Sequence, residues 1–240
     1  MSAVGAAAKG HADGFDFGWV RIYTANMATI APPVGFKVDN QPLIAEGRLF
    51  RISRERYHEM IETGLFDSDD EYELIHGYLL KKMARNQAHI WVVRLLVTLL
   101  RQLLTEGSGW FVVKEDPIAL YDSEPEPDVV VVRGSETDYW DLPEPQDIGL
   151  VVEVSDSTLS TDRSVKKPLY AQEGIREYWI VDVKGRRVEV YTEPFILGDS
   201  ADYRHTTTYT ERDEIEVVLD GKNLGRIPLT NIFPPTENAA

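Results

Sequence analysis

The chain has 240 residues, contains no cysteine and carries a net charge of −15 from 40 acidic and 25 basic residues. At 43% hydrophobic content, this length predicts one soluble globular domain with a sizeable core. The absence of cysteine excludes a disulfide framework, a thiolate nucleophile and a thiolate metal site, and agrees with a reducing, intracellular setting.

The N-terminus does not have the pattern of a secretory signal, because no basic segment precedes an apolar run there. The longest apolar run, HIWVVRLLVTLLRQLL, is interrupted by Arg94 and Arg101 and is too short to span a bilayer. We therefore expect a cytoplasmic protein with no membrane partner.

Charge is unevenly distributed along the chain. The net negative charge argues against a nucleic-acid partner, because phosphate binding relies on clustered lysine and arginine. Basic residues nevertheless concentrate at 76–114 and 163–187, whereas acidic residues concentrate at 115–147 and 189–220. The sequence is thus compatible with a locally basic face on an acidic molecule.

Residues 1–45 are rich in alanine and glycine and then irregular, which predicts a tail or accessory arm before a domain at 46–235 and a C-terminal tail at 236–240. A short helix is expected over 53–64, with Ser53 as N-cap and Gly64 as its stop. Residues 72–83 have strand, turn and strand character, with His76 and Gly77 in the turn.

The strongest helix signal covers residues 86–105. Its polar residues form one narrow stripe at spacings of four, three and four, and nearly all its other residues are apolar. Such a helix must be covered on most sides, so it is expected to pack in the core. The stripe consists of Arg94, Thr98, Arg101 and Thr105.

The remaining segments predict a mixed α/β domain built on one central sheet. A helix over 166–174 has Pro168 in its first turn, where a missing N–H costs little. A hairpin is expected over 177–192, around Lys184 and Gly185. Strands are expected at 110–114, 117–121, 128–133 and 148–154, with weaker β structure at 206–210, 214–219 and 227–233.

One carboxylate stands inside the most apolar of these strands. In the stretch IGLVVEVSDS, Glu153 is surrounded by residues typical of a strand that is buried on both faces. Burying an ionised carboxylate without a partner costs several kcal/mol. Asp128 begins the preceding apolar strand, and neighbouring strands lie about 4.8 Å apart. If the two strands pair, both carboxylates can point into one small volume.

Two adjacent carboxylates repel each other unless a cation neutralises them. An all-oxygen donor set favours a hard cation, Mg²⁺ first and Mn²⁺ second. We expect Asp128, Glu153 and the backbone carbonyl of Val154 to hold this ion. Lys166 and Lys167, at the start of the next helix, could then stabilise charge on a phosphoryl group.

These segments resemble a known family. EPDVVVV, LVVEVSDST, TDRSVKKPLYAQEGIREYWIVD and YELIHGYL with the following His89 are similar to the Uma-two family, described as bacterial putative restriction endonucleases. The resemblance extends over roughly residues 50–235. It implies a restriction-endonuclease-like fold of the PD-(D/E)XK nuclease superfamily, with a central mixed sheet flanked by helices and with extra β hairpins.

The resemblance also implies roles for individual residues. Asp128 matches the first acid of the PD motif and Glu153 matches the acid of (D/E)XK. The lysine position two residues after Glu153 holds Ser155, and Lys166 on the following helix matches the lysine that this family carries instead. Glu73 and Glu115 match further acids that recur in the family, one of which could add a ligand or position water.

Each of these residues also has a structural interpretation. Asp128 could simply begin a strand, and Glu153 could belong to a buried ion pair. His89, in the first turn of the core helix, is expected to be a polar cap rather than a ligand. Lys166 and Lys167 could form a solvated helix start. We expect core positions, not base-stacking platforms, for three aromatic residues, Tyr170, Tyr178 and Trp179.

The function predicted first is a Mg²⁺-dependent endonuclease that hydrolyses phosphodiester bonds of DNA. Two alternatives stay open: a catalytically inactive nuclease fold that acts as a binding module, and a metal phosphodiesterase acting on small substrates. The net charge and the missing lysine of the ExK motif favour the inactive binding module. A homodimer is implied by the resemblance alone.

Overall fold

The computed structural model describes residues 50–66 and 71–235, so the predicted arm at 1–45 and the tail at 236–240 lie outside the described residues. Residues 51–240 form a compact unit of their own, which contains every predicted site residue. Its helices and strands are α2 (Arg54–Glu62), β1 (Tyr72–Ile75), β2 (Tyr78–Lys81), α3 (Gln87–Leu103), β3 (Trp110–Lys114), β4 (Val129–Arg133), β5 (Ile148–Ser155), α4 (Leu159–Thr161), α5 (Lys167–Gln172), β6 (Glu177–Asp182), β7 (Arg187–Leu197), β8 (Ser200–Thr210), β9 (Glu214–Leu219) and β10 (Lys222–Pro228).

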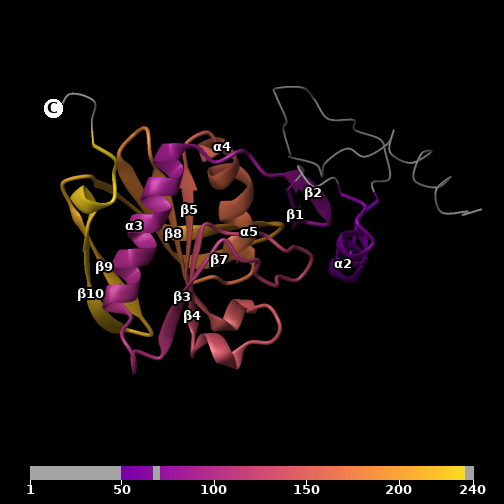
Figure 1. Cartoon of the computed structure of the whole chain (residues 1–240), viewed down its shortest axis with the longest axis horizontal. Coiled ribbons are helices and arrows are strands. Elements are labelled where there is room, and N and C mark those ends of the chain that lie inside the picture. The colour runs from indigo at the N-terminus through magenta and orange to yellow at the C-terminus, as the bar shows by residue number, and fades with distance from the viewer. Residues whose placement is uncertain (1–49, 67–70, 236–240) are drawn as a thin grey trace, which may run out of the picture. The chain divides into compact units, whose positions relative to one another are not determined.

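The centre of the fold is a six-stranded mixed sheet with the order β3-β4-β5-β6-β7-β8 (Figure 1). Every neighbouring pair is antiparallel except β5 and β6, which run parallel. Parallel strands require a crossover of a dozen or more residues. Here the crossover contains α4 and α5 and begins after Ser155, two residues beyond Glu153. The predicted mixed α/β class with a central mixed sheet is confirmed.

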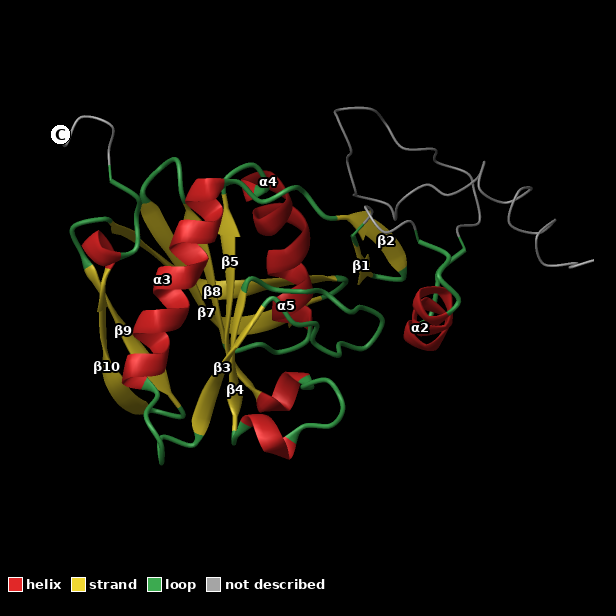
Figure 2. Ribbon diagram, viewed as in Figure 1, coloured by secondary structure: helices red, strands yellow, loops and turns green. Residues whose placement is uncertain are grey.

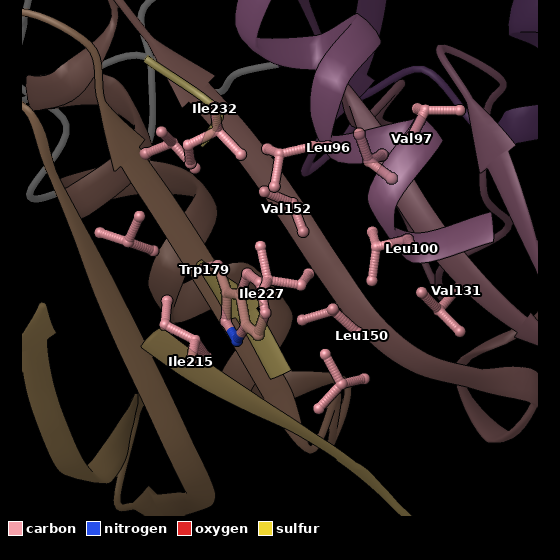
Figure 3. Packing of buried hydrophobic residues seen from close by; sticks show 14 of the residues in the cluster. Leu96, Val97, Leu100, Val131, Leu150, Val152, Trp179, Ile215, Ile227 and Ile232 are labelled. Atoms are coloured by element: carbon pink, nitrogen blue, oxygen red, sulfur yellow. The ribbon is translucent and has the colours of Figure 1, made fainter. Parts of the chain in front are cut away.

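Each face of the sheet has its own cover. Helix α3 and the β9–β10 hairpin pack on one face, and α5 packs on the other (Figure 2). Figure 3 shows α3 residues Leu96 and Leu100 against the apolar side chains of β4 and β5, with Trp179 of β6 nearby. Full burial of such side chains contributes roughly 1.5–3 kcal/mol each, so both layers are firmly held on the sheet.

The predicted core helix is confirmed. Asn86 is its N-cap, with the side chain accepting a hydrogen bond from the His89 N–H, and the helix ends at Leu103, two residues before the predicted Thr105. Arg94 and Thr98 are exposed, as the polar stripe predicts. The cap at Asn86 fixes the start of the helix, which lies at the same end of the sheet as Asp128.

Both predicted hairpins, at 72–83 and 177–192, are present. A further hairpin, formed by β7 and β8, follows the second of them. The β1–β2 turn contains His76 and Gly77, with φ of 50° and 77°, which are the positive values that a tight hairpin turn requires. The β6–β7 turn contains Lys184 and Gly185 as predicted. Strands β7 and β8 each extend to eleven residues, so the weak β signal at 206–210 is the end of a long hairpin.

The predicted strand at 117–121 is wrong, because these residues form no strand in the described structure. Ile118 and Leu120 are buried, but their N–H groups donate to carbonyls of the same loop, while Ala119 donates to Pro143. These bonds run to loop residues and not to a neighbouring strand. The apolar character of the segment reflects burial without a strand partner.

The helix predicted at 166–174 begins earlier, at Leu159. Between α4 and α5 the chain makes a π-helical turn over Asp162–Lys166, in which the N–H of Lys167 bonds to the carbonyl of Asp162. Pro168 follows this turn directly, where its missing N–H is accommodated. Wide helical turns of this kind occur frequently at functional sites, and this one carries Lys166.

Strand β5 is buried along its whole length, as predicted. Leu150, Val152 and Val154 face α3, whereas Val151 faces α5. Because side chains alternate along a strand, Glu153 lies on the α5 face with Val151. The carboxylate of Glu153 is therefore directed at the crossover helix that follows it in sequence.

Candidate active site

Asp128 and Glu153 lie opposite each other on neighbouring antiparallel strands. The register pairs Val129 of β4 with Val152 of β5, so the residue before Val129 faces the residue after Val152. Asp128 and Val130 share one face by alternation, and Val130 belongs to the same apolar cluster as Val151. The strand pairing assumed from sequence is present, and it brings both acids to one end of the sheet.

Asp128 is held at both carboxylate oxygens. The backbone N–H of Val154 donates to Oδ2 at 2.7 Å, and His89 Nε2 lies 2.9 Å from Oδ1. The C=O of a strand residue points to the same side as its N–H, so the Val154 carbonyl also faces the Asp128 edge of β5. Asp128, Glu153 and Val154 thus lie at the same end of the sheet.

Glu153 is 4% exposed and is hydrogen-bonded to two side chains of the crossover. Lys166 Nζ lies 3.0 Å and the Tyr170 hydroxyl 2.8 Å from Glu153 Oε1. Burial raises the pKa of Glu153 well above its ordinary value; Lys166 lowers it in part, and the neighbouring acids raise it further. Burial and the Glu153 charge likewise raise the pKa of the Tyr170 hydroxyl, so Tyr170 acts as a donor.

Lys166 links Glu153 to the β1–β2 hairpin. Its Nζ also lies 3.1 Å from Glu73 Oε1, and the side chain is 8% exposed. Burial opposes its charge, but attraction to Glu153, Glu73 and Asp162 outweighs burial and raises the pKa of Lys166 well above its ordinary value. Lys166 is therefore a buried, charged ammonium group within contact of two carboxylates.

A further acid, Asp162, is 2% exposed and lies in the π-helical turn. The hydroxyls of Ser155 and Thr158 donate to Asp162 Oδ2 at 2.6 and 2.7 Å. Burial raises the pKa of Asp162, while Lys166 and the two hydroxyl donors oppose this rise. Ser155 thus anchors the turn that presents Lys166.

One cavity of about 200 Å³ is bordered by Glu73, His89, Asp128, Glu153, Val154, Asp162 and Lys166. We call the other lining segments, residues 80–86, 156–158 and Thr161, the rims of the cavity. One water occupies roughly 30 Å³ in the liquid, so the cavity has room for a cation with several water molecules. Six acids line the cavity: Glu73, Glu126, Asp128, Glu153, Asp156 and Asp162.

Comparison with known proteins identifies the family of the chain. Residues 54–224 match the family model Uma2, described as "Putative restriction endonuclease". The chain belongs to the Uma2 family. The Uma2 chain also resembles a crystal structure from Anabaena variabilis, titled as a putative nuclease belonging to DUF820, with a TM-score of 0.56 at 14% identity over 76% of this chain and 97% of that chain. At such a low sequence identity, the similarity shows a shared fold and says nothing of a shared function. No curated protein matches the sequence.

Family and fold are therefore those of restriction-endonuclease-like nucleases, as the resemblance implied. Among the predicted site residues of this Uma2 protein, the structure brings together Asp128, Glu153, Val154, Lys166 and Glu73 at the cavity. Ser155 lies directly behind them through its bond to Asp162.

Two of the additional candidates have other partners. Glu115 lies 3.1 Å from both Arg85 Nη1 and Lys114 Nζ, and its side chain does not border the cavity. Lys167 Nζ lies 2.8 Å from Asp202 and over the ring of Tyr191. Adjacent helical residues point about 100° apart. Lys166 therefore reaches Glu153 of β5, whereas Lys167 reaches β7 and β8 of the same sheet.

Sequence reasoning missed three residues of the site. His89 was expected to be a polar cap, yet its ring contacts Asp128 while Asn86 provides the cap. Tyr170 is buried as expected, but its hydroxyl bonds to Glu153. Asp162 was not singled out, although it stands in the segment TDRSVKKPLY that carries the resemblance. Its position after Ser155 and Thr158, both short hydroxyl donors, was the available signal.

The donor set suits a hard cation. Among residues 50–66 and 71–235, no group of three or more histidine or acidic side chains is arranged as a ready metal cage. Two carboxylates and a backbone carbonyl instead border a cavity with space for water. Mg²⁺ is commonly bound in this way, by one or two carboxylates together with waters and a substrate phosphate.

The rims carry basic residues that already contact acids. Lys82 pairs with Glu126, and Arg85 pairs with Glu115. In the basic segment 163–187, Arg163 contacts Glu189. The locally basic face that the sequence allowed is thus largely neutralised by neighbouring acids. No helix in the described part of the chain is long and apolar enough to cross a membrane.

Proposed function

We propose that this Uma2 protein is a divalent-metal-dependent endonuclease that hydrolyses phosphodiester bonds of DNA. The observation that carries the proposal is the opposition of Asp128 and Glu153 on paired strands, with Lys166 Nζ 3.0 Å from Glu153. Two acids and one ammonium group in one cavity are the combination expected for phosphodiester hydrolysis.

Asp128, Glu153 and the Val154 carbonyl would hold Mg²⁺, with Mn²⁺ as the second choice. When bound, such an ion lowers the pKa of water and neutralises charge on the phosphate. His89 and the Val154 N–H hold Asp128 in place, and Tyr170 holds Glu153. Preorganised ligands of this kind keep the site close to its productive geometry.

Lys166 supplies the ammonium group that the ExK position lacks. Ser155 occupies that position, but its hydroxyl is committed to Asp162. The π-helical turn presents Lys166 from the crossover instead, beside Glu153. An ammonium group there can stabilise negative charge that develops on the phosphoryl oxygens.

The proposal is tested by plasmid cleavage with Mg²⁺ or Mn²⁺. We expect nicking or linearisation by the wild type, and at least a hundredfold loss in Asp128→Asn and Glu153→Gln. Glu177→Gln is the matched control, because Glu177 is a partly buried carboxylate that lies outside the cavity. Cleavage that survives in both Asp128→Asn and Glu153→Gln would refute these roles.

One observation favours a second candidate, a metal phosphodiesterase for small substrates. The cationic rim residues Lys82 and Arg85 already pair with acids, and the protein carries a net charge of −15. Both features weaken attraction to polyanionic DNA. Turnover of bis(p-nitrophenyl) phosphate without measurable DNA binding would favour this candidate. Salt-dependent DNA binding without turnover would favour the inactive binding module.

Two further predictions remain from the sequence. The resemblance implies a homodimer, which light scattering after size-exclusion chromatography can measure. A cytoplasmic location is the expectation from sequence, and fractionation of expressing cells checks it.

A further inference from the structure

Lys166 contacts two carboxylates at once. Its Nζ lies 3.0 Å from Glu153 Oε1 and 3.1 Å from Glu73 Oε1. All three side chains are at most 8% exposed, so these contacts are largely shielded from bulk solvent. The ammonium group thus serves as a shared counter-ion for two buried acids.

The two acids differ in how their oxygens are used. Glu73 accepts from Lys166 at Oε1 and from the Glu126 backbone N–H at Oε2, so both of its oxygens are committed. Both partners of Glu153 among the described residues, Lys166 and Tyr170, contact Oε1. Glu153 can therefore offer Oε2 to a cation, whereas Glu73 is already fixed as a partner of Lys166.

The carboxyl groups around Lys166 outnumber its single ammonium group. Glu73, Asp128 and Glu153 oppose the single charge of Lys166, which leaves two negative charges when all three acids are ionised. A divalent cation would balance these charges. Asp162 is held separately by two hydroxyl donors. The excess negative charge therefore lies where Asp128 and Glu153 face each other.

A cation on Glu153 would bring two positive groups to one carboxylate. Charges a few ångströms apart interact strongly in a buried site, so the ion and Lys166 would repel each other at Glu153. We propose that Lys166 is the counter-ion of Glu153 in the cation-free protein, that a divalent cation replaces it there, and that Glu73 retains the displaced ammonium group at the cavity. The inference rests on the proposed cation at Asp128 and Glu153, and it makes Glu73 a positioning residue for Lys166 rather than a metal ligand.

Titration calorimetry with Mn²⁺ on the full-length protein tests the competition. Removing the competing charge in Lys166→Met is expected to tighten Mn²⁺ binding by about tenfold or more. Lys167→Met is the matched control, since Lys167 is adjacent in sequence but pairs with Asp202, and its affinity should equal that of the wild type. Unchanged or weaker Mn²⁺ binding in Lys166→Met would overturn the inference.

A double-variant comparison tests the role of Glu73. If Glu73 acts through Lys166, Glu73→Gln weakens Mn²⁺ binding in the wild-type background, because Lys166 then contacts Glu153 alone. The same substitution should have a clearly smaller effect in the Lys166→Met background. An equal loss in both backgrounds would show that Glu73 binds the ion directly and would overturn its positioning role.

Crystals of the wild-type protein soaked in MnCl₂ provide a test that does not depend on the folding of a variant. We expect the ion on Asp128 and Glu153, with Lys166 Nζ in contact with Glu73 and no longer with Glu153. An ion bound there with Lys166 still on Glu153 would refute the competition. If no ion binds in the crystal, the metal must be removed from the proposed function as well. Displacement of Lys166 without DNA cleavage would leave this inference intact and refute the endonuclease.

Discussion

His89 Nε2 lies 2.9 Å from Asp128 Oδ1, so the first turn of α3 is tied to the acid that precedes β4. Because a carboxylate only accepts, Nε2 carries the proton in this contact. Nδ1 of the same ring is buried and has no hydrogen-bond partner among the described residues. The ring is therefore held chiefly by Asp128, and Asp128 by the ring.

We predict that His89→Ala weakens Mn²⁺ binding and DNA cleavage by roughly 10- to 100-fold, the usual cost of removing a group that orients a metal ligand. His89→Gln retains an N–H donor and should restore part of the affinity. Mn²⁺ titration and plasmid cleavage measure both variants, with His205→Ala, an exposed position on β8, as control. Wild-type affinity in His89→Ala would contradict the prediction.

Arg85 on the cavity rim offers a test of DNA contact. If Arg85 contacts a phosphate, Arg85→Ala should lower the slope of log K against log salt by about 0.9. Fluorescence anisotropy of a labelled duplex at several salt concentrations measures this slope. Arg226→Ala, on the exposed β10 strand, should leave the slope unchanged. Equal slopes for Arg85→Ala and the wild type would place the DNA elsewhere.

Gly149 is required by the packing of β5. A Cβ atom at this position would lie 2.7 Å from Trp110 Cζ3 and 2.9 Å from Leu219 Cδ2. Gly149→Ala should destabilise the protein by about 1–3 kcal/mol, the usual cost of overpacking, in urea unfolding. Adding Trp110→Leu should recover part of the loss, because the two substitutions share one contact. Additive losses would show that the clash is not the cause.

Glu177 makes stability depend on pH. Burial raises its pKa to about 7, although the hydrogen bond from Trp179 lowers it in part. Its folded-state pKa exceeds the unfolded value, so stability is full below about pH 4.5 and falls as pH rises through 7. Glu177→Gln should therefore stabilise the protein by roughly 2 kcal/mol at pH 8 and very little at pH 4.

Urea unfolding of Glu177→Gln and the wild type at the two pH values measures this difference. Glu193→Gln, at an exposed position on β7, is the control and should change stability little at either pH. A stabilisation of Glu177→Gln that is equal at pH 4 and pH 8 would exclude ionisation as its cause.

Local sequence patterns predicted most elements correctly. The apolar run with one polar stripe gave α3, and the run of valines around Glu153 gave β5, because periodicity and burial are readable in adjacent residues. Residues 117–121 carry the same apolar signal without being a strand. Their burial was predictable, but their hydrogen-bond partners were not, since Pro143 and Pro125 reach them only in the folded chain.

Some residues of the candidate site could likewise be predicted from the sequence, and others could not. Asp128, Glu153 and Lys166 could be identified from residue type and from the resemblance, and all three border the cavity. Glu115 and Lys167 carried similar signals but point to other partners. The contact of His89 with Asp128 and the role of Asp162 were not predicted, because a histidine in a first helical turn, or an acid in a polar segment, has no distinctive local pattern.

The amino-acid sequence by itself determined the mixed α/β class, the buried carboxylate in β5 and the residue types available for chemistry, since each depends on neighbours in the chain. Only the tertiary structure decided that Asp128 faces Glu153, that Lys166 and not Lys167 reaches it, and that His89 and Glu73 close the site. Strand register and helix rotation set those contacts. Both are fixed by packing between segments far apart in sequence, where a single residue of shift turns a side chain away.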